Sequence, residues 1–216
     1  MSDPRPVGPD DRPVPETLLD EAAIRECVER LAAEIAADHP DGVVLVGVLK
    51  GALIFLADLA RAVRDVDVEI GFIAISRYAP DSGRVRILHD VDVELTGRDV
   101  ILVEDLVDTG LTLGYLVEHV RGQDPRRVEV CALLDRPARR ILPLTVRYVG
   151  REIPDVFVLG YGLHRADLYR NVPRVVVADR ELVRTRPDAY VPALYGSGNG
   201  RAAEGRGEGR GGPVLG

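Results

Sequence analysis

Residues 20–38 show the hydrophobic spacing of an amphipathic helix. Ile24, Val28 and Leu31 lie three or four positions apart, so they share one face of such a helix. Asp20 stands directly before them, where a carboxylate accepts a hydrogen bond from a backbone amide of the first turn. The pattern predicts a helix that begins just after Asp20 and buries one face.

Further along the chain, continuous apolar runs alternate with helical periods. The run GVVLVGVL at 42–49 is typical of a strand buried on both faces of a sheet, and helices are predicted at 51–63 and 110–121. Further strands are predicted at 66–75, 85–88, 99–104, 126–134, 145–149, 156–160 and 174–178. This alternation predicts an α/β fold with a mainly parallel sheet.

Both ends of the chain differ from the segments between them. Residues 1–15 are rich in Pro and Asp, and Gly dominates the last part of 191–216. Such segments bury too little apolar surface to offset the entropy of ordering. We therefore predict one domain at 16–190 between two disordered segments. The tail is interpreted as a solvated appendage, with RNA contact by its Arg-Gly repeats as the weaker alternative.

Composition narrows the class of protein. A net charge of −7 argues against the basic footprint of a nucleic-acid-binding protein. No apolar run approaches the roughly 20 residues of a membrane span, and the first 16 residues lack a signal-peptide pattern. The two cysteines, Cys27 and Cys131, match no metal-ligand spacing. We expect a cytoplasmic protein with no membrane or nucleic-acid partner.

The predicted sheet indicates where a ligand binds. In open α/β sheets, ligands lie beyond the carboxyl ends of the parallel strands. Three such ends follow Leu49, Val103 and Leu134, and each is followed by charged residues. We expect a site at this edge of the sheet.

The segment 100–113, VILVEDLVDTGLTL, places three carboxylates beside a small-residue turn. The turn at 109–112 opens a helix, so its amides and hydroxyls suit a phosphate. Glu104 and Asp105 suit a pair of sugar hydroxyls or Mg²⁺, and Asp108 remains for proton transfer. The alternative is a helix N-cap with surface acids. That alternative explains Asp108 but not two more acids at a buried strand's end.

This segment resembles the phosphoribosyl-pyrophosphate (PRPP) signature of the phosphoribosyltransferases. It most resembles the 6-oxopurine (hypoxanthine-guanine) branch, in which the fourth residue after the Glu is Asp. The resemblance extends over about 18–180, in the family's order. LVGVLKGALIFLADLARA is similar to the pyrophosphate loop and its helix, ALLDRPARR to the base-contacting loop, and IPDVFVLGYGLHRADLYRNVP to the C-terminal purine and pyrophosphate segment.

The resemblance implies a fold and a reaction. The fold is the type I phosphoribosyltransferase fold, a mainly parallel sheet flanked by helices with a small hood and a mobile lid loop. The reaction transfers the phosphoribosyl group from PRPP to hypoxanthine or guanine, forming IMP or GMP, with Mg²⁺ as cofactor. Pyrophosphate is released, and Asp108 is the general base toward the purine N7. Family members are usually homodimers or homotetramers.

The resemblance also assigns the other site residues. In this family the peptide bond before the lysine of the pyrophosphate loop, here Leu49-Lys50, is typically cis. Taken without the family, Lys50 is equally a surface charge and Phe157 is more often a core residue. The assigned residues are Lys50, Gly51 and Arg170 for pyrophosphate; Glu104, Asp105, Asp108, Thr109, Gly110, Leu111 and Thr112 for PRPP; Arg136, Phe157 and Val158 for the purine; Arg77 and Tyr78 for the lid; and Glu104 and Asp105 for Mg²⁺, directly or through water.

Three positions depart from the family pattern. Arg136 replaces a lysine that commonly contacts the oxygen at C6, which leaves open xanthine or a modified purine as the base. His164 replaces an aspartate that supports a second Mg²⁺. It leaves the number of metal ions open, since an imidazole can instead donate to pyrophosphate. Arg77 replaces a serine before the lid tyrosine.

A non-catalytic regulator is the alternative from another class. Such regulators keep the fold, sense PRPP or nucleotides and bind RNA or DNA. They often lose the acid that corresponds to Asp108, and they need a basic face. Asp108 and the negative net charge both argue against this alternative. A dinucleotide-binding dehydrogenase is excluded because no predicted strand leads into G-x-G-x-x-G.

Overall fold

The computed structural model describes residues 13–76 and 86–196 of the 216-residue chain. The predicted lid residues Arg77 and Tyr78 lie outside the described residues, as do residues 1–12 and 197–216 of the predicted disordered ends.

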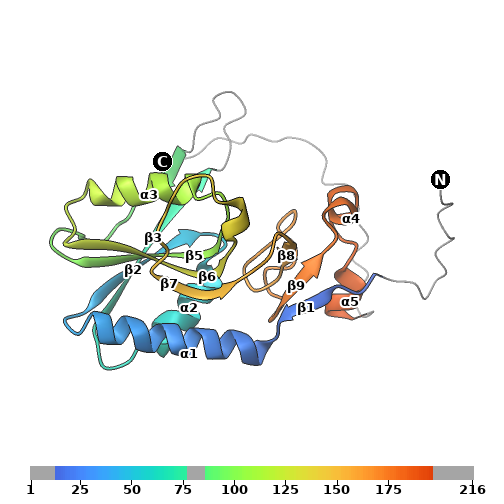
Figure 1. Ribbon diagram of the computed structural model, residues 1–216, viewed down its shortest axis with the longest axis horizontal. Coiled ribbons are helices and arrows are strands. Elements are labelled where there is room, and N and C mark those ends of the chain that lie inside the picture. Colours follow the sequence, from blue (N-terminus) through green and yellow to red (C-terminus); the bar gives the residue numbers. More distant parts are fainter. Residues whose placement is uncertain (1–12, 77–85, 197–216) are drawn as a thin grey trace, which may run out of the picture.

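A six-stranded sheet forms the centre of the molecule (Figure 1). Its strands are β2 (Val43–Leu49), β3 (Val68–Ser76), β4 (Arg86–His89), β5 (Asp99–Val107), β6 (Arg127–Asp135) and β7 (Tyr148–Glu152). They lie in the order β4-β3-β2-β5-β6-β7, and only the β3–β4 pair is antiparallel. The predicted α/β fold with a mainly parallel sheet is confirmed.

Helices cover both faces of this sheet (Figure 1). The helices α1 (Glu21–Asp38) and α2 (Leu53–Ala62) lie on one face, and α3 (Leu111–Arg121) lies on the other. The predicted cap of α1 is present, since Asp20 Oδ1 accepts a hydrogen bond from Ala23 N at 2.8 Å. An apolar core lies on each face of the sheet. Ile24, Val28 and Leu31 are buried in the core beneath α1 and α2, as their spacing predicts. In the described part of the chain, no helix is long and apolar enough to cross a membrane.

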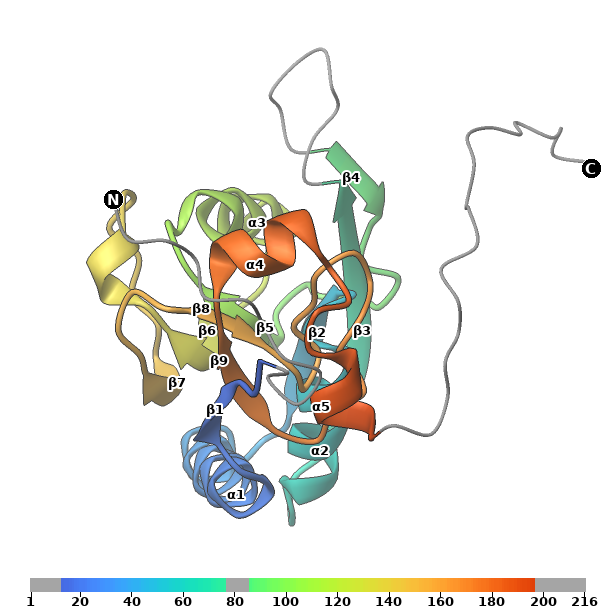
Figure 2. The same cartoon turned by 90° about the vertical axis from the view of Figure 1, so that its right-hand side faces the viewer.

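A smaller antiparallel sheet stands beside the carboxyl ends of the parallel strands (Figures 1 and 2). It comprises β1 (Glu16–Leu19), β9 (Val175–Ala178) and β8 (Phe157–Leu159), in that order. The helices α4 (Arg180–Thr185) and α5 (Val191–Tyr195) pack against it around a third core. Figure 2 views this unit, the hood, from its outer side. The strands β8 and β9 were predicted, whereas β1, α4 and α5 were not.

The helix α5 corrects the predicted start of the tail. Residues 191–195 were assigned to the disordered segment, yet they form a helical turn. Tyr190, directly before them, is buried, and the ring of Tyr195 stacks on that of Tyr169 with 6.3 Å between the centroids. These aromatic contacts stabilise a segment whose composition alone does not predict order.

The strand β5 also extends further than predicted. Its end was expected at Glu104, but the ladder with β6 continues to Val107, which pairs with Asp135. Glu104 and Asp105 therefore lie within the strand and are buried, 5% and 4% exposed. Their carboxylates are fixed by the sheet rather than carried on a loop.

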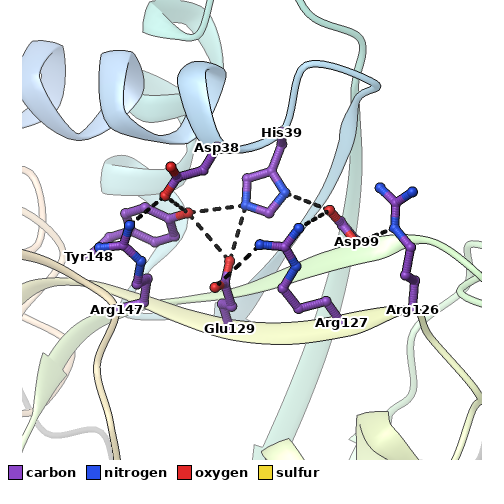
Figure 3. A network of polar contacts seen from close by, with 8 residues as sticks. All are labelled: Asp38, His39, Asp99, Arg126, Arg127, Glu129, Arg147 and Tyr148. Atoms are coloured by element: carbon purple, nitrogen blue, oxygen red, sulfur yellow. Dashed lines mark hydrogen bonds and ion pairs between the residues drawn. The ribbon is translucent and has the colours of Figure 1, made fainter.

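A buried polar network lies at the opposite ends of the same strands (Figure 3). His39, which caps α1, is within 2.8 Å of Asp99 on β5 and within 3.1 Å of both Glu129 on β6 and Tyr148 on β7. Arg126 donates to Asp99 at 2.7 Å. Hydrogen bonds from Arg126 and then His39 lower the pKa of Asp99 to about 2, although burial acts in the opposite direction. This network ties α1 to three strands at the end remote from the cavity described below.

Candidate active site

A cavity of about 440 Å³ lies where the carboxyl ends of the parallel strands meet the hood. It brings together nine of the predicted residues. These are Lys50, Gly51, Asp105, Asp108, Arg136, Phe157, Val158, His164 and Arg170. Of the predicted residues that the structure describes, Glu104 and Thr109 to Thr112 do not line it. The residues that were predicted from three separate strand ends and the hood thus share one cavity.

Close backbone packing forms one end of the cavity. The Leu49-Lys50 peptide bond is cis, as the resemblance implies. A Cβ atom at Gly51 would collide with the Asp105 carboxylate. Gly162 has φ +96°, and a Cβ atom there would collide with the carbonyl oxygen of Gly51. Glycine is required at 162, because its φ is positive and the collision is with backbone, whereas a side chain at position 51 would displace the Asp105 carboxylate.

Cations gather at this end. Arg170 Nη1 donates to Gly162 O at 2.6 Å, and its Nη2 donates to Asp167 Oδ1 at 3.1 Å. Its Nε is buried and has no partner among the described residues. Arg170 first, and Lys50 next, hold the pKa of Asp167 below its ordinary value. The positive charge and the unfilled donor suit an anionic ligand.

His164 lies beside Asp167, which sequence reasoning had not selected. Asp167 N donates to His164 Nδ1 at 3.1 Å. Nδ1 is therefore the acceptor, and a neutral imidazole here carries its proton on Nε2. His164 is a hydrogen-bond donor in this tautomer.

Asp108 and Arg136 form the opposite end of the cavity. Arg136 Nη1 lies 3.4 Å from Asp108 Oδ2, and Arg139 Nη1 lies 3.9 Å from the same oxygen. Arg136 is only 3% exposed; burial lowers the pKa of its guanidinium, and Asp108 opposes this shift. Asp108 Oδ1 and Arg136 Nε are both buried without a partner in the described part of the chain. Buried polar atoms are normally hydrogen-bonded, so this acceptor and this donor indicate a ligand.

Two further residues that line this end, Arg180 and Arg139, were not predicted. Arg180, the first residue of α4, lies over the ring of Phe157 at 5.5 Å from its centroid and lines the cavity. Arg139 Nε donates to Asp155 Oδ1 at 2.5 Å. Arg139 lies three residues after Arg136 in ALLDRPARR, the segment that resembles the base-contacting loop, so its place in that loop could have indicated a position at the site. Arg180 had no comparable signal, because the pairing of β8 with β9 brings it to Phe157.

The turn that opens α3 is held from outside. Gly110 caps the helix with φ +80°, a conformation that favours glycine. Ile141 N donates to Thr109 O at 2.9 Å, and Arg140 Nε donates to Asp108 O at 3.1 Å. Arg140, another residue not predicted, also pairs with Asp135. The predicted phosphate turn is thus a fixed structure beside the cavity.

A metal ion would need ligands beyond the protein. In residues 13–76 and 86–196, no three His, Cys, Asp or Glu side chains are grouped to hold a metal ion. The carboxylate of Asp105 does line the cavity beside the Lys50-Gly51 loop. Mg²⁺ is commonly bound by one or two carboxylates together with substrate phosphates and water, and this arrangement fits that donor set.

Comparison with known proteins gives a consistent result. The model of the phosphoribosyl transferase domain family matches residues 16–166. The chain is 40% identical over 168 residues to the hypoxanthine-guanine phosphoribosyltransferase of Bacillus subtilis, covering 76% of this chain and 93% of the relative. It is 39% identical to the hypoxanthine phosphoribosyltransferase of Salmonella typhimurium, covering 74% and 93%.

Solved structures agree with these relatives. The crystal structure of a hypoxanthine-guanine phosphoribosyltransferase from Bacillus anthracis, with a HEPES molecule in its active site, superposes with a TM-score of 0.74 at 42% identity. The match covers 77% of this chain and all of that one.

Proposed function

The chain belongs to the phosphoribosyltransferase family, and we propose that it transfers the 5-phosphoribosyl group from PRPP to hypoxanthine or guanine. The products are IMP or GMP and pyrophosphate, and the reaction serves purine salvage. One observation carries the choice of base: Asp108 Oδ1 and Arg136 Nε, at one end of the cavity, are buried and have no partner among the described residues.

A 6-oxopurine matches this acceptor and donor. Its O6 accepts a hydrogen bond, and in the N7–H tautomer the adjacent N7 donates one. Arg136 can therefore donate to O6 while Asp108 accepts from N7. Adenine presents an amino group in place of O6, and this donor would face the Arg136 guanidinium. The site thus favours oxopurines over adenine.

The proposed chemistry places Asp108 at the proton. The purine N9 forms a bond to C1 of the ribose as the bond from C1 to the pyrophosphate oxygen breaks. The N7 proton passes to Asp108, so that the ring system is neutral in the product. Phe157, which lines the same end, supplies an apolar face for the base, and the backbone of Val158 contacts its edge.

The other end of the cavity suits the leaving pyrophosphate. We assign Lys50, Gly51 and Arg170 to this group, since the two cations stabilise the charge that develops on it. Arg170 Nε, which has no partner in the part of the chain that the structure describes, is available as a further donor. Mg²⁺, held by the buried carboxylates of Asp105 and Glu104 directly or through water, would neutralise part of the same charge.

The ribose 5-phosphate is assigned to β5 and the turn that follows it. Glu104 and Asp105 are proposed to accept hydrogen bonds from the ribose hydroxyls. The residues of the turn, Thr109, Gly110, Leu111 and Thr112, are proposed to bind the 5-phosphate, because the first amides of α3 lie there.

His164 is assigned to pyrophosphate rather than to a metal ion. Because Nδ1 accepts the amide hydrogen of Asp167, the neutral ring presents Nε2–H as a donor. A donor binds a phosphate oxygen, whereas Mg²⁺ requires an acceptor.

Location and assembly are proposed on separate grounds. Cys27 and Cys131, the chain's two cysteines, are both free and buried, which is typical of a reducing compartment such as the cytoplasm. A homodimer or homotetramer is proposed because large apolar side chains remain exposed on α3, at Leu111 and Tyr115. Light scattering at several protein concentrations would test the assembly.

The activity is tested by nucleotide formation from PRPP and Mg²⁺ with hypoxanthine, guanine, xanthine or adenine. We expect turnover of hypoxanthine or guanine and none of adenine. Xanthine is a second candidate base, because Arg136 and Arg180 place two guanidinium groups at the base end of the cavity. Binding of PRPP without turnover of any base would contradict the proposed reaction and favour a PRPP-sensing regulator.

A further inference from the structure

A hydrogen bond between Tyr161 and Asp58 lies near the pyrophosphate end of the cavity but does not line it. Tyr161 Oη donates to Asp58 Oδ2 at 2.6 Å. Asp58 lies on α2, which follows the Lys50-Gly51 loop, and Tyr161 lies in the segment that leaves β8. The bond therefore connects a helix that covers the six-stranded sheet with a loop of the hood.

The phenol of Tyr161 is held in one place and one protonation state. It is 6% exposed, and burial together with the Asp58 carboxylate raises its pKa far above the ordinary value for tyrosine. It remains a donor at neutral pH. The backbone of Tyr161 has φ +47°, a left-handed conformation that is uncommon outside glycine. Such conformations persist where surrounding contacts hold them, and they cluster at functional sites.

The next residue transmits this position to the cavity. Gly162 packs on the carbonyl oxygen of Gly51 so closely that a Cβ atom would not fit. Its own carbonyl accepts from Arg170 Nη1 at 2.6 Å, and its amide donates to Arg170 O at 2.9 Å. Gly162 thus lies between Gly51 and Arg170, two of the residues that are assigned to pyrophosphate.

We propose that the Tyr161–Asp58 hydrogen bond is a positioning contact that sets the separation of Gly51 and Arg170, and through it the affinity for pyrophosphate. Gly51 is connected along the chain to Asp58 on α2, and Asp58 accepts the hydrogen bond from Tyr161. Gly162, the next residue after Tyr161, packs back against Gly51. Removing the Tyr161–Asp58 bond frees the hood loop relative to α2. The inference rests on the proposed function, because it assumes that pyrophosphate binds at this end of the cavity.

The test compares a ligand that needs this end with one that does not. Tyr161→Phe removes only the hydroxyl. Calorimetry on the full-length protein would measure binding of pyrophosphate with Mg²⁺ and, separately, of IMP, which carries no pyrophosphate. Because the hood loop loses its hydrogen bond to α2, we expect pyrophosphate to bind about tenfold more weakly and IMP to bind unchanged.

Tyr195→Phe is the matched control. Tyr195 Oη donates to Asn171 Oδ1 at 2.8 Å, so this variant also removes one tyrosine hydrogen bond from the hood. It leaves the contact with α2 intact, and we expect wild-type affinity for both ligands. Asp58→Asn is the second variant. Asp58 also pairs with Arg61, but both of these residues lie on α2, so that pair does not join α2 to the hood. The double variant Tyr161→Phe/Asp58→Asn is therefore expected to bind pyrophosphate no more weakly than Tyr161→Phe alone, because both changes remove the same contact between α2 and the hood.

The outcomes separate the inference from the proposed function. Unchanged pyrophosphate affinity in Tyr161→Phe would overturn the inference alone, provided that the wild-type protein binds pyrophosphate. Equal weakening of pyrophosphate and IMP would also overturn it, because that result indicates a general loss of structure. A wild-type protein that binds neither ligand would overturn the proposed function and the inference with it.

Discussion

Arg136 and Asp108 face each other at the base end of the cavity, with 3.4 Å between guanidinium Nη1 and carboxylate Oδ2. Each also holds a buried polar atom without a partner among the described residues. One guanidinium nitrogen and one carboxylate oxygen thus form an ion pair, while a second nitrogen and a second oxygen remain available for hydrogen bonds. A ligand that carries both an acceptor and a donor can bind to these two atoms.

Replacing Asp108 with Asn should abolish most turnover while leaving PRPP bound. Asn keeps the size of the side chain but cannot take up the N7 proton. Loss of a general base lowers the rate by about 10²–10⁴-fold. Steady-state rates with hypoxanthine and PRPP titration calorimetry would measure the two effects. A variant with wild-type kcat would exclude Asp108 as the proton acceptor.

Replacing Arg136 with Lys and with Gln should separate charge from geometry. Gln removes the cation, and we expect kcat/KM for hypoxanthine to fall by about 10–100-fold, the value of a charged hydrogen bond. Lys retains one charged donor and should restore most of that activity. Its single ammonium does not reproduce the fork of Arg, so the ratio of xanthine to hypoxanthine turnover should fall. An unchanged ratio would show that Arg136 does not set the base preference.

Gly162→Ala should affect both stability and the site, whereas Gly97→Ala should affect stability alone. Both glycines have positive φ, +96° and +69°. A Cβ atom at Gly97 meets nothing within 4 Å, while at Gly162 it meets the Gly51 carbonyl. The left-handed conformation alone costs about 1–2 kcal/mol for a residue with a side chain. Urea unfolding should show at least this loss in both variants, and only Gly162→Ala should weaken pyrophosphate binding. Weaker binding in Gly97→Ala would contradict the role of the collision.

Acid should destabilise the protein through Asp99. Its folded pKa of about 2 lies below the unfolded value near 4, so its contribution is present above pH 4 and is lost as the pH falls from 4 to 2. The contribution is about 2 kcal/mol. Asp99→Asn should lower the free energy of unfolding at pH 7 and flatten its dependence below pH 4. Asp92→Asn, at an exposed loop residue, is the control and should keep the wild-type profile. An acid profile of Asp99→Asn parallel to wild type would show that other carboxylates dominate.

His164→Asp should lower the Mg²⁺ concentration that gives half-maximal rate. A carboxylate is an oxygen ligand for Mg²⁺, whereas the imidazole here is a donor. His164→Asn, which removes the imidazole without adding charge, should not lower that concentration. Rates measured across a Mg²⁺ titration would compare the three proteins. The same requirement in wild type and His164→Asp would indicate that position 164 has no influence on the metal.

Local patterns predicted the elements that local patterns determine. The apolar run of β2, the periodicity of α1 and the cap at Asp20 depend on residues within one element, and the structure confirms them. The end of β5 depends on its ladder with β6, so the strand continued past Glu104 despite two acids. The short strand β1 exists only because β9 lies beside it.

The candidate site divides in the same way. Asp108 stands out in the sequence because two further acids and a turn surround it. Arg180 reaches the cavity only because Phe157 on β8 pairs with Ala178 on β9. These two strands are separated in the sequence by the whole hood loop. Gly162 is an ordinary loop glycine until the fold brings Gly51 against it. Contacts between segments distant in the sequence explain why Arg180 and Gly162 were missed.

The burial of Glu104 and Asp105 within β5 has a consequence for the energetics of ligand binding. Their backbone is held by neighbouring strands, and the Asp105 carboxylate is further fixed by its hydrogen bond with Leu106 N at 2.8 Å. Desolvation and ordering of these groups are therefore completed when the chain folds. A ligand that reaches them meets preorganised acceptors and loses little affinity to side-chain ordering. At this edge of the sheet, folding therefore supplies the cost of ordering and desolvating the two carboxylates, and ligand binding does not have to supply it again.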